Sequence, residues 1–336
     1  MKFLIRTSGG RAKKRELGLG HVYRCVNLVS ELKPSDVYFA VEDYGGVKEV
    51  LTKKGYNNIL FLKKNMDVSS DIKKTIDFVN QQEIDVLIID KYKIGIKYVK
   101  EVRKFVKTIL ISDLRNIDYP ADLVVNGFIG YKNEIIRNKY GTKCLIGPSF
   151  QILNKKFAER NLLPRKKYTL LATFGGFDEK NLVEILLKSL RGYLPKINTK
   201  IILGPATSKS RTIELFKRKY KKHLKIVSET ANMQKEIADA RFGLCSGGIT
   251  TYEFAAVGIP FAIICQVKHQ LITAREWRRK GLALNLGLVN NRTRHKIEEL
   301  LQNITENRFH KRAYDKRIVD GFGSQRVMNK ILHMMH

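Results

Sequence analysis

Residues Phe242–Pro260, FGLCSGGITTYEFAAVGIP, indicate the fold more directly than any other stretch of this chain. The stretch begins with a short apolar run that fits a buried strand, continues through a Ser-Gly-Gly turn, and then becomes amphipathic. Gly258 followed by Ile-Pro is a helix stop signal, so the amphipathic part is predicted to be a helix over 249–257. Strand, glycine turn and helix in this order are typical of the βα units that build parallel sheets.

The same alternation extends over nearly the whole chain, whose 336 residues are enough for two ordinary domains. The segment 148–167, with Pro148, Pro164 and a charged run, interrupts it and is predicted to connect two domains. We therefore expect an α/β protein of two Rossmann-like, doubly wound domains, residues 1–150 and 151–336, with their strand ends facing a cleft. A final helix is expected to pack back on the N-terminal domain.

The predicted strands and helices follow from these patterns. Strands are predicted at 2–6, 36–41, 57–62, 85–90, 107–113, 123–127, 143–147, 168–174, 199–204, 224–228, 242–246 and 260–265. Helices are predicted at 21–32, 47–54, 71–82, 97–105, 179–190, 210–223, 232–240, 249–257 and 269–280.

The composition describes a folded protein with a strong positive charge. Hydrophobic residues make up 43% and charged residues 28%, which rules out intrinsic disorder, and no apolar run reaches the roughly twenty residues of a spanning helix. The 63 Lys and Arg against 32 Asp and Glu give a net charge of +31, spread over both halves, so nucleic acid is not specifically implied. The four cysteines are widely spaced and form no zinc-binding pattern, which fits reduced thiols. The N-terminus does not resemble a signal peptide, so we expect a cytoplasmic protein.

A long glycine-rich, basic loop follows the first predicted strand, which ends at Arg6. The segment 7–21, TSGGRAKKRELGLGH, leads into a helix, and glycines such as Gly18 and Gly20 allow a ligand to approach the backbone. The loop is not a dinucleotide fingerprint, because Tyr23 stands in place of the third glycine, and the chain has no Walker motif. It is therefore predicted to bind an anion or a sugar.

His21 stands in the first turn of the helix that follows this loop. The positive end of the helix dipole lowers the pKa of an imidazole there, which predicts a neutral ring at pH 7 that can take a proton from a nucleophile. A capping or otherwise structural histidine is an equally good interpretation. Arg24, one turn further on the same face, either binds a phosphate or pairs with a carboxylate.

The second half contains two glycine turns, Gly175–Gly176 and Ser246–Gly248, each between a predicted strand and a helix. Backbone N–H groups at such turns suit a diphosphate. A tight βα turn without a ligand is the alternative, but two such turns in one domain favour a phosphate site. Glu253 lies just beyond the second turn, where its carboxylate can accept both hydroxyls of a ribose or simply interact with the helix dipole.

The chain offers no pattern for a metal or an organic cofactor. The Asp-x-Asp motif, which holds a divalent ion on the nucleotide diphosphate in single-sheet glycosyltransferases, is absent, so we expect neither a metal nor another cofactor. The basic clusters 216–225, FKRKYKKHLK, and 275–281, REWRRKG, are interpreted first as solvated helix faces and second as a surface for anionic lipid.

Together these segments resemble the family of UDP-sugar hydrolases of pseudaminic acid biosynthesis (UDP-2,4-diacetamido-2,4,6-trideoxy-β-L-altropyranose hydrolases) and related spore-coat polysaccharide proteins. Both belong to the two-domain GT-B glycosyltransferase superfamily. The matching segments run almost from end to end. They are Arg6 with GLGHVYRC (18–25), IIDKY (88–92), ISDL (111–114), ADLVVNG (121–127), CLIGPSFQILNKKF (144–157), TFGGFDEKN (173–181), NMQKEIADARFGLCSGGITTYEFAAVGIP (232–260) and VKHQ (267–270).

The resemblance implies a role for particular residues. Carried over by position, it makes His21 the base that activates water and Tyr92 a contact of the sugar. Gly247 and Gly248 become phosphate ligands and Glu253 the ribose ligand. His269 stands where the hydrolases usually carry Asn and is the second candidate base. Further residues of the matching segments are expected to bind substrate: Arg6, Gly18, Gly20, Arg24, Gly175, Gly176, Met233, Ser246, Ile249, Thr250 and Gln270.

The activity that this resemblance implies first is metal-independent, inverting hydrolysis of a UDP-2,4-diacetamido-2,4,6-trideoxyhexose in the biosynthesis of pseudaminic or legionaminic-like acids. A GT-B transferase with a UDP-sugar donor, acting in cell-surface glycan synthesis, needs the same base and stays open. A sensor that binds a nucleotide sugar without turnover is a third interpretation. We expect a monomeric cytoplasmic protein with a UDP-sugar substrate, no nucleic-acid partner, and peripheral contact with the inner face of an anionic membrane.

Overall fold

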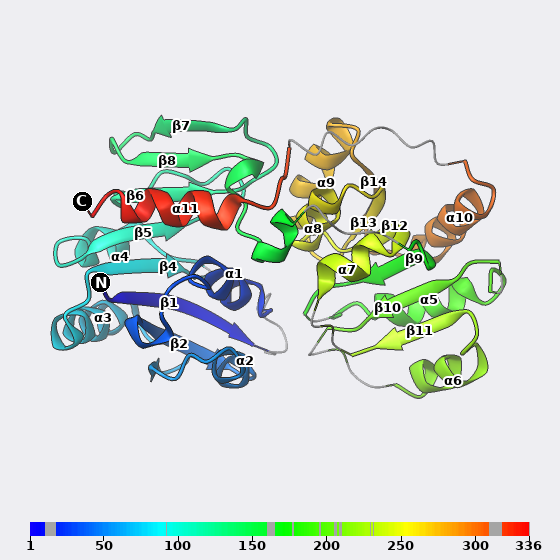
Figure 1. Cartoon of the computed structure of the whole chain (residues 1–336), viewed down its shortest axis with the longest axis horizontal. Helices are drawn as coiled ribbons and strands as arrows, with labels where there is room; N and C mark the ends of the chain where they lie inside the picture. The colour runs from blue at the N-terminus through cyan, green and yellow to red at the C-terminus, as the bar shows by residue number, and fades with distance from the viewer. Residues whose placement is uncertain are drawn as a thin grey trace. The chain divides into compact units, whose positions relative to one another are not determined.

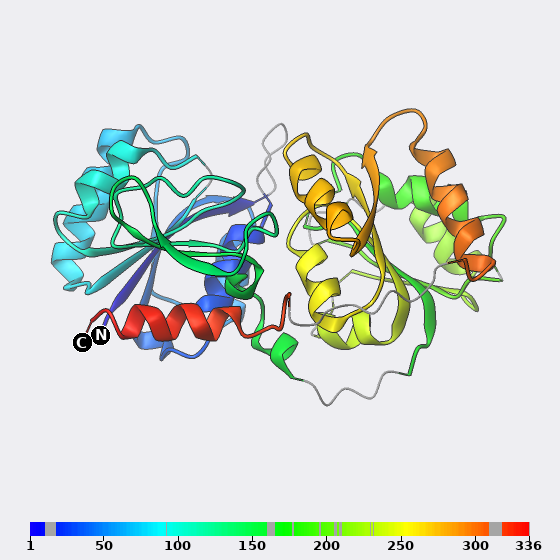
Figure 2. The same cartoon turned by 90° about the horizontal axis from the view of Figure 1, so that it is seen from above.

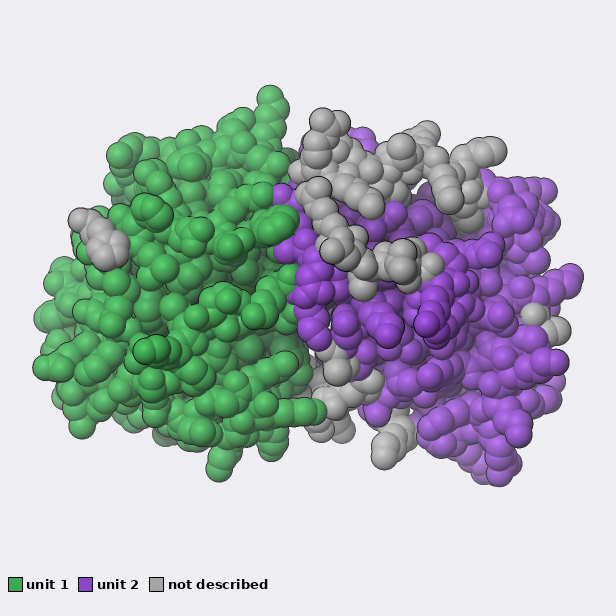
Figure 3. Space-filling view, in the orientation of Figure 1, with its two compact units in different colours: residues 1–155, 321–336 green, residues 156–320 purple. Residues whose placement is uncertain are grey.

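The computed structural model describes residues 1–10, 18–91, 93–159, 165–176, 178–194, 196–204, 207, 210–228, 230, 232–308 and 318–335. The chain forms two compact units (Figure 3), of which unit 1 comprises Met1–Lys155 with Gly321–His336 and unit 2 comprises Lys156–Asp320. The change from one unit to the other falls after Lys155 rather than after 150, because Ile152 is still buried in the core of unit 1.

Unit 1 is built on an eight-stranded sheet in the order β3-β2-β1-β4-β5-β6-β8-β7 (Figure 1). All neighbouring strands are parallel except β7 and β8, which are antiparallel. The strands are β1 (Phe3–Gly10), β2 (Val37–Tyr44), β3 (Ile59–Phe61), β4 (Val86–Asp90), β5 (Lys107–Ile111), β6 (Leu123–Asn126), β7 (Glu134–Arg137) and β8 (Lys143–Ile146). The helices are α1 (Gly20–Leu28), α2 (Val47–Lys53), α3 (Val68–Gln82), α4 (Ile96–Val102) and α11 (Gly323–Leu332).

Two apolar cores lie on the two faces of this sheet, because side chains alternate along each strand. Phe3 and Ile5 of β1 belong to the core formed with α1, α2 and α11, whereas Leu4 belongs to the core formed with α3 and α4 (Figures 1 and 2). All eight residues of β1 are buried. A strand buried on both faces is what a doubly wound parallel sheet requires.

The last helix, α11, packs on unit 1. Val327 and Ile331 lie in the same core as the residues of α1, and the Ser324 hydroxyl donates a hydrogen bond of 2.5 Å to the Leu153 carbonyl. A Cβ added at Gly323 would lie 2.0 Å from the backbone oxygen of Gln151, so the helix begins in direct contact with the chain that leaves the sheet. This contact requires glycine at position 323.

Unit 2 has a six-stranded sheet, all parallel, in the order β11-β10-β9-β12-β13-β14. This is the strand order of a Rossmann-type sheet, so the predicted class of two doubly wound α/β sheets is confirmed. The strands are β9 (Tyr168–Thr173), β10 (Thr199–Ile202), β11 (Leu224–Val227), β12 (Ala240–Cys245), β13 (Phe261–Cys265) and β14 (Ala283–Leu288). The helices are α5 (Leu182–Leu190), α6 (Arg211–Lys219), α7 (Met233–Ala238), α8 (Thr250–Val257), α9 (Gln270–Arg279) and α10 (Thr293–Thr305).

Several element boundaries differ from the predicted ones for identifiable reasons. Helix α3 begins at Val68 rather than at 71, because the Asp67 carboxylate accepts the Ser70 N–H and so caps the helix. Helix α5 begins at Leu182 rather than at 179, because Asn181 has a left-handed backbone and the Asp178 carboxylate accepts the N–H groups of Leu182 and Val183. Strands β7 and β14 were not expected, since the first is short and exposed and the second is half-buried at a sheet edge.

Across the described part of the chain, none of the helices combines the length and the apolar character that crossing a membrane requires.

Candidate functional site

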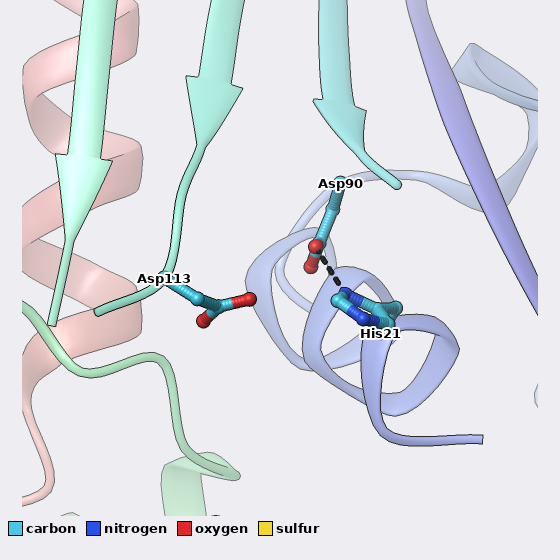
Figure 4. Close-up of side chains that lie close together, drawn as sticks. All are labelled: His21, Asp90 and Asp113. Carbon is cyan, nitrogen blue, oxygen red and sulfur yellow. Dashed lines mark hydrogen bonds and ion pairs between the residues drawn. The ribbon is translucent and has the colours of Figure 1, made fainter. Parts of the chain in front are cut away.

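The first candidate site lies in unit 1, at the carboxyl ends of β4 and β5. Asp90 is the last residue of β4, Asp113 follows β5 by two residues, and His21 lies in the first turn of α1. The His21 Nδ1 atom is 2.6 Å from the Asp90 Oδ1 atom (Figure 4). Ligands of parallel α/β sheets bind at this end of the strands, so the three side chains occupy the expected edge.

The contact with Asp90 fixes how His21 can act. Because Nδ1 faces the carboxylate, Nε2 is the ring nitrogen left for a ligand, and no partner for it lies among the described residues. The His21 side chain is 20% exposed, whereas that of Asp90 is 1% exposed. A buried carboxylate behind a partly exposed imidazole orients the ring and stabilises the imidazolium that forms when Nε2 takes a proton.

The prediction that the helix dipole lowers the pKa of His21 is wrong. Burial does oppose the charged ring, but the charge of Asp90 and its hydrogen bond to Nδ1 outweigh burial and raise the pKa of His21 above its ordinary value. Sequence reasoning missed Asp90, although IIDKY was recognised as a matching segment. The available signal was an acidic residue at the end of a fully buried strand next to β1.

Arg24 joins this group by pairing with two carboxylates. Its Nε and Nη2 atoms donate to the two oxygens of Asp90 at 2.7 and 2.6 Å, and Nη1 donates to Asp113 Oδ1 at 2.6 Å. Of the two predicted roles for Arg24, pairing with a carboxylate is therefore the one observed.

The same residues include the one group in the described chain with metal-ligand spacing. One ligand atom each from His21, Asp90 and Asp113 lies within 4.8 Å of the other two. The Arg24 guanidinium already engages both carboxylates, so a metal ion would have to displace it. In this structure the Arg24 guanidinium, through its hydrogen bonds to Asp90 and Asp113, holds the two carboxylates together.

Arg6, an expected substrate contact, lies in the interior of unit 1 instead. Its side chain is 0% exposed, and it pairs with Asp71 at 2.7 Å and with Glu42 at 2.5 Å. The Lys91 amine reaches the same two carboxylates at 2.9 and 2.6 Å. Direct binding of a ligand by Arg6 would require these buried pairs to open. Lys91 directly follows Asp90, so the cluster instead anchors the chain at the end of β4.

The glycine-rich loop is only partly described. Gly18 and Gly20 lie at the start of α1, and a Cβ added at Gly20 would meet open space. The basic segment 11–17 and Tyr92 lie outside the described residues, so the structure does not address the sugar contact that was expected of Tyr92.

The second candidate site lies in unit 2, at the turn between β12 and α8. Helix α8 has no side-chain cap, and the N–H groups of Gly248, Ile249 and Thr250 have no hydrogen-bond partner within the described ranges. Two hydrogen bonds fix the conformation of the turn: the Trp277 indole donates to the Thr251 hydroxyl, and that hydroxyl donates to the Gly248 carbonyl. Free N–H donors at a helix start favour negative charge, which is the property that the predicted phosphate site requires.

Other predicted residues surround this turn. A Cβ added at Gly247 would lie 2.8 Å from the Cβ of Gln270, and one added at Gly175 would lie 3.7 Å from the Ser246 hydroxyl. Gln270 accepts a hydrogen bond from the Gln266 N–H. The structure therefore brings Gly175, Ser246, Gly247 and Gln270 together at one end of the sheet.

The Gly175–Gly176 turn does not offer a second helix start for a phosphate. The carboxylate of Asp178 accepts the N–H groups of Leu182 and Val183 at 2.9 and 2.8 Å, so the first turn of α5 already holds an anionic group. The two glycine turns therefore differ, because Asp178 occupies N–H groups at the start of α5, whereas no described side chain caps the start of α8.

Glu253 lies in the first turn of α8 and is half-buried. Burial raises its pKa to about 7, and a hydrogen bond with Thr250 offsets only part of this effect. A carboxylate was expected here, and its raised pKa makes the protonated acid more accessible near neutral pH than for an exposed glutamate. Met233 begins α7 and is half-buried, and His269 is exposed directly before α9.

Comparison with known proteins gives three relatives at low identity. The chain is 28% identical over 285 residues to an uncharacterized protein of Methanocaldococcus jannaschii, covering 79% of this chain and 56% of that protein. It is 26% identical over 284 residues to the spore coat polysaccharide biosynthesis protein SpsG of Bacillus subtilis, with 81% of each chain covered. It is 25% identical over 289 residues to the UDP-2,4-diacetamido-2,4,6-trideoxy-β-L-altropyranose hydrolase of Campylobacter jejuni, covering 84% and 97%. The chain thus spans little more than half of the first of these relatives.

Solved structures show the fold. Acinetobacter baumannii MurG matches with a TM-score of 0.60 at 14% identity, covering 99% of this chain and 100% of that one. Staphylococcus aureus MnaA, solved with UDP, matches with a TM-score of 0.62 at 13% identity, covering 100% and 97%. No protein-family model matches the chain. The GT-B fold class and the resemblance to the spore-coat and UDP-sugar hydrolase proteins are confirmed.

Proposed function

We propose that this chain is a UDP-sugar enzyme in which His21 is the general base. The contact between His21 and Asp90 carries the proposal, because it orients an imidazole at the ligand-binding end of a sheet and leaves Nε2 available. The names of two relatives, a UDP-sugar hydrolase and a polysaccharide biosynthesis protein, support the substrate class.

The reaction that fits best is inverting hydrolysis of a UDP-2,4-diacetamido-2,4,6-trideoxyhexose in nonulosonic acid biosynthesis. The name of the Campylobacter relative, a hydrolase of a UDP-sugar of this kind, supports the substrate. Nε2 of His21 takes a proton from water while the water oxygen bonds to the anomeric carbon. The bond from that carbon to the diphosphate oxygen breaks, and UDP leaves with the electron pair. Asp90 stabilises the imidazolium, which returns its proton to solvent.

UDP binding is assigned to unit 2. The diphosphate would accept hydrogen bonds from the free N–H groups at the start of α8, and the ribose hydroxyls would donate to Glu253. These donors act on the charge that develops on the leaving group, so the mechanism needs no divalent metal ion. Activity lost to a chelator and restored by magnesium would contradict this part of the proposal.

Turnover with a panel of UDP-sugars, followed by NMR for UDP and free sugar, tests the reaction. His21→Asn should fold and bind UDP normally but lose about a hundredfold or more of turnover, the usual effect of removing a general base. The matched control is His295→Asn, because His295 is an exposed histidine on α10. Full turnover by His21→Asn would refute the assignment.

The pH profile gives a second test of the base. Because the pKa of His21 is raised above its ordinary value of 6.5, turnover should fall on the acid side with a midpoint above pH 6.5. A midpoint below that value would contradict a base held by Asp90.

A glycosyltransferase with the same donor is the second candidate, and the surface of α6 favours it. Six cationic side chains are exposed on and just after α6, beside Leu215, which is 46% exposed: Arg211, Lys217, Arg218, Lys219, Lys221 and Lys222. Cations around an exposed apolar side chain fit an anionic membrane surface, where a lipid-linked acceptor would be found.

Vesicle binding tests this second candidate. The protein should sediment with phosphatidylcholine vesicles that contain phosphatidylglycerol and not with phosphatidylcholine alone. Lys217→Glu/Arg218→Glu should abolish binding, whereas Lys73→Glu/Lys74→Glu, an equal charge change on α3, should not. UDP release only in the presence of an acceptor would favour the transferase over the hydrolase.

A further inference from the structure

Arg24 is the one residue of the unit 1 site that contacts every other charged member of it. Its guanidinium is hydrogen-bonded to both oxygens of Asp90 and to Asp113, and Nη2 lies 3.2 Å from Nδ1 of His21. Asp113 is also contacted by Nη2 at 3.1 Å. The four side chains therefore form a chain of alternating charge, in the order His21, Asp90, Arg24 and Asp113.

We propose that Arg24 and Asp113 are positioning residues that set how readily His21 accepts a proton. The positive charge of Arg24 weakens the attraction between Asp90 and the imidazolium. The negative charge of Asp113 partly offsets that of Arg24 and so restores some of this attraction. This inference rests on the proposed role of His21 as the base. Neither residue is taken to touch the reacting atoms.

The geometry gives each residue a definite sign. Asp90 has two oxygens, and Arg24 shares Oδ1 with the imidazole while holding Oδ2 alone. A cation on the same carboxylate, and 3.2 Å from the ring, makes a second positive charge on His21 less favourable. Arg24 therefore favours the neutral ring, whereas the negative charge of Asp113, one step further out, favours the imidazolium.

Exposure limits the size of these effects. The side chains of Asp90 and Arg24 are buried, at 1% and 9% exposure, whereas the Asp113 side chain is 54% exposed. Water screens the exposed end of the chain of charges, so Asp113 should act more weakly than Arg24. The pKa directions agree with this order, because Arg24 lowers and Asp113 raises the pKa of His21.

Few other ionisable groups described in the structure face this site. On α1 the Cys25 thiol lies 3.7 Å from Asp90 Oδ2, and burial raises its pKa well above the ordinary value, so it stays neutral. The charged groups from β4, α1 and the end of β5 are thus Asp90, Arg24 and Asp113 themselves. A change in the titration of His21 can be traced to these residues.

The test is an NMR titration of the His21 ring in protein labelled with ¹⁵N-histidine, the signal being assigned by its loss in His21→Asn. Arg24→Gln should raise the pKa of His21 by about one unit and Asp113→Asn should lower it by a smaller amount. The double variant should lie nearer to Arg24→Gln, because Asp113 acts through Arg24. Arg103→Gln, which breaks an exposed pair with Asp122 in the same unit, should change nothing.

Shifts of the same sign in the two variants, or no shift in either, would overturn the proposal. If Arg24→Gln does not fold, Arg24→Lys keeps the positive charge and should leave the pKa of His21 close to that of the wild type, while Asp113→Asn still tests the outer step. The titration needs no UDP-sugar, so it stands or fails separately from the proposed function. If turnover is observed, its acid limb should move in the same direction as the NMR value in each variant.

Discussion

Glu253 provides the sharpest prediction, because burial raises its pKa to about 7, within the range where binding is easily measured. If both ribose hydroxyls of UDP donate to this side chain, one to each oxygen, they need the carboxylate, because the protonated acid uses one of its oxygens as a donor. UDP affinity should therefore rise with pH as Glu253 ionises. The perturbation is a change of pH, and Glu253→Gln is the matched variant that cannot ionise.

The expected size follows from the fraction of carboxylate in the free protein. With a pKa of about 7, the ionised fraction is about 3% at pH 5.5 and about 97% at pH 8.5. The part of the affinity that depends on Glu253 should change about 30-fold over this interval, or about 2 kcal/mol. The full change is reached only if the carboxylate strengthens binding by at least this much, which lies within the roughly 1.5–3 kcal/mol of hydrogen bonds to a charged group.

Isothermal titration calorimetry at about pH 5.5, 7 and 8.5 measures this change. The phosphate groups of UDP also titrate, but they do so equally with both proteins, so the ratio of wild-type to Glu253→Gln affinity isolates Glu253. If the carboxylate strengthens binding about 30-fold over the amide, the ratio should be about 2 at pH 5.5 and about 30 at pH 8.5. At pH 7 the wild type should also release about half a proton on binding, seen as a dependence of the heat on the buffer. A ratio that stays constant across pH would refute the assignment of Glu253 as the ribose ligand.

Asp178→Ala should destabilise the chain by about 1 kcal/mol, because the first N–H groups of α5 lose their acceptor. UDP affinity should not change, since the anion site is proposed at α8, and weaker UDP binding by the folded variant in calorimetry would contradict this. Gly323→Ala should cost more than about 1 kcal/mol in urea unfolding because its Cβ would lie 2.0 Å from a backbone oxygen, whereas Gly95→Ala, where a Cβ meets open space, should cost much less. The pKa values of Asp71 and Glu42 are lowered, because Arg6 and Lys91 outweigh the effect of burial. The two carboxylates therefore stabilise the folded state above the ordinary carboxyl pKa of about 4, and this stabilisation is lost as the pH falls below that value towards their lowered pKa values. The free energy of unfolding should therefore fall between about pH 5 and 3 more steeply in the wild type than in Asp71→Asn, by up to about 1.4 kcal/mol per pH unit. Equal slopes would show that the cluster does not lower the pKa of Asp71.

Much of the fold follows from local signals. The buried run 86–90 predicts a strand, and the segment 242–260 predicts a strand–turn–helix unit. Neither prediction depends on the rest of the fold, because side-chain periodicity and the helix stop at Gly258 act over a few residues. Short or half-exposed elements such as β7 and β14 escaped prediction, since they carry little apolar pattern and are held by pairing with distant strands. The N-terminal cap of α3 was readable in principle, because Asp67 precedes the helix.

The sequence by itself determined the two-sheet α/β architecture, the resemblance to UDP-sugar proteins, and most of the residues that gather at the glycine turn before α8. Only the tertiary structure decided which partners surround the candidate site residues. The pKa of His21 is raised by Asp90, which is distant in sequence and adjacent only because β4 lies beside β1. Arg6 is buried, and the start of α5 is already capped by Asp178. Local sequence fixes backbone preferences over a few residues, whereas the charge state of a side chain depends on burial and on partners that only folding brings within a few ångströms.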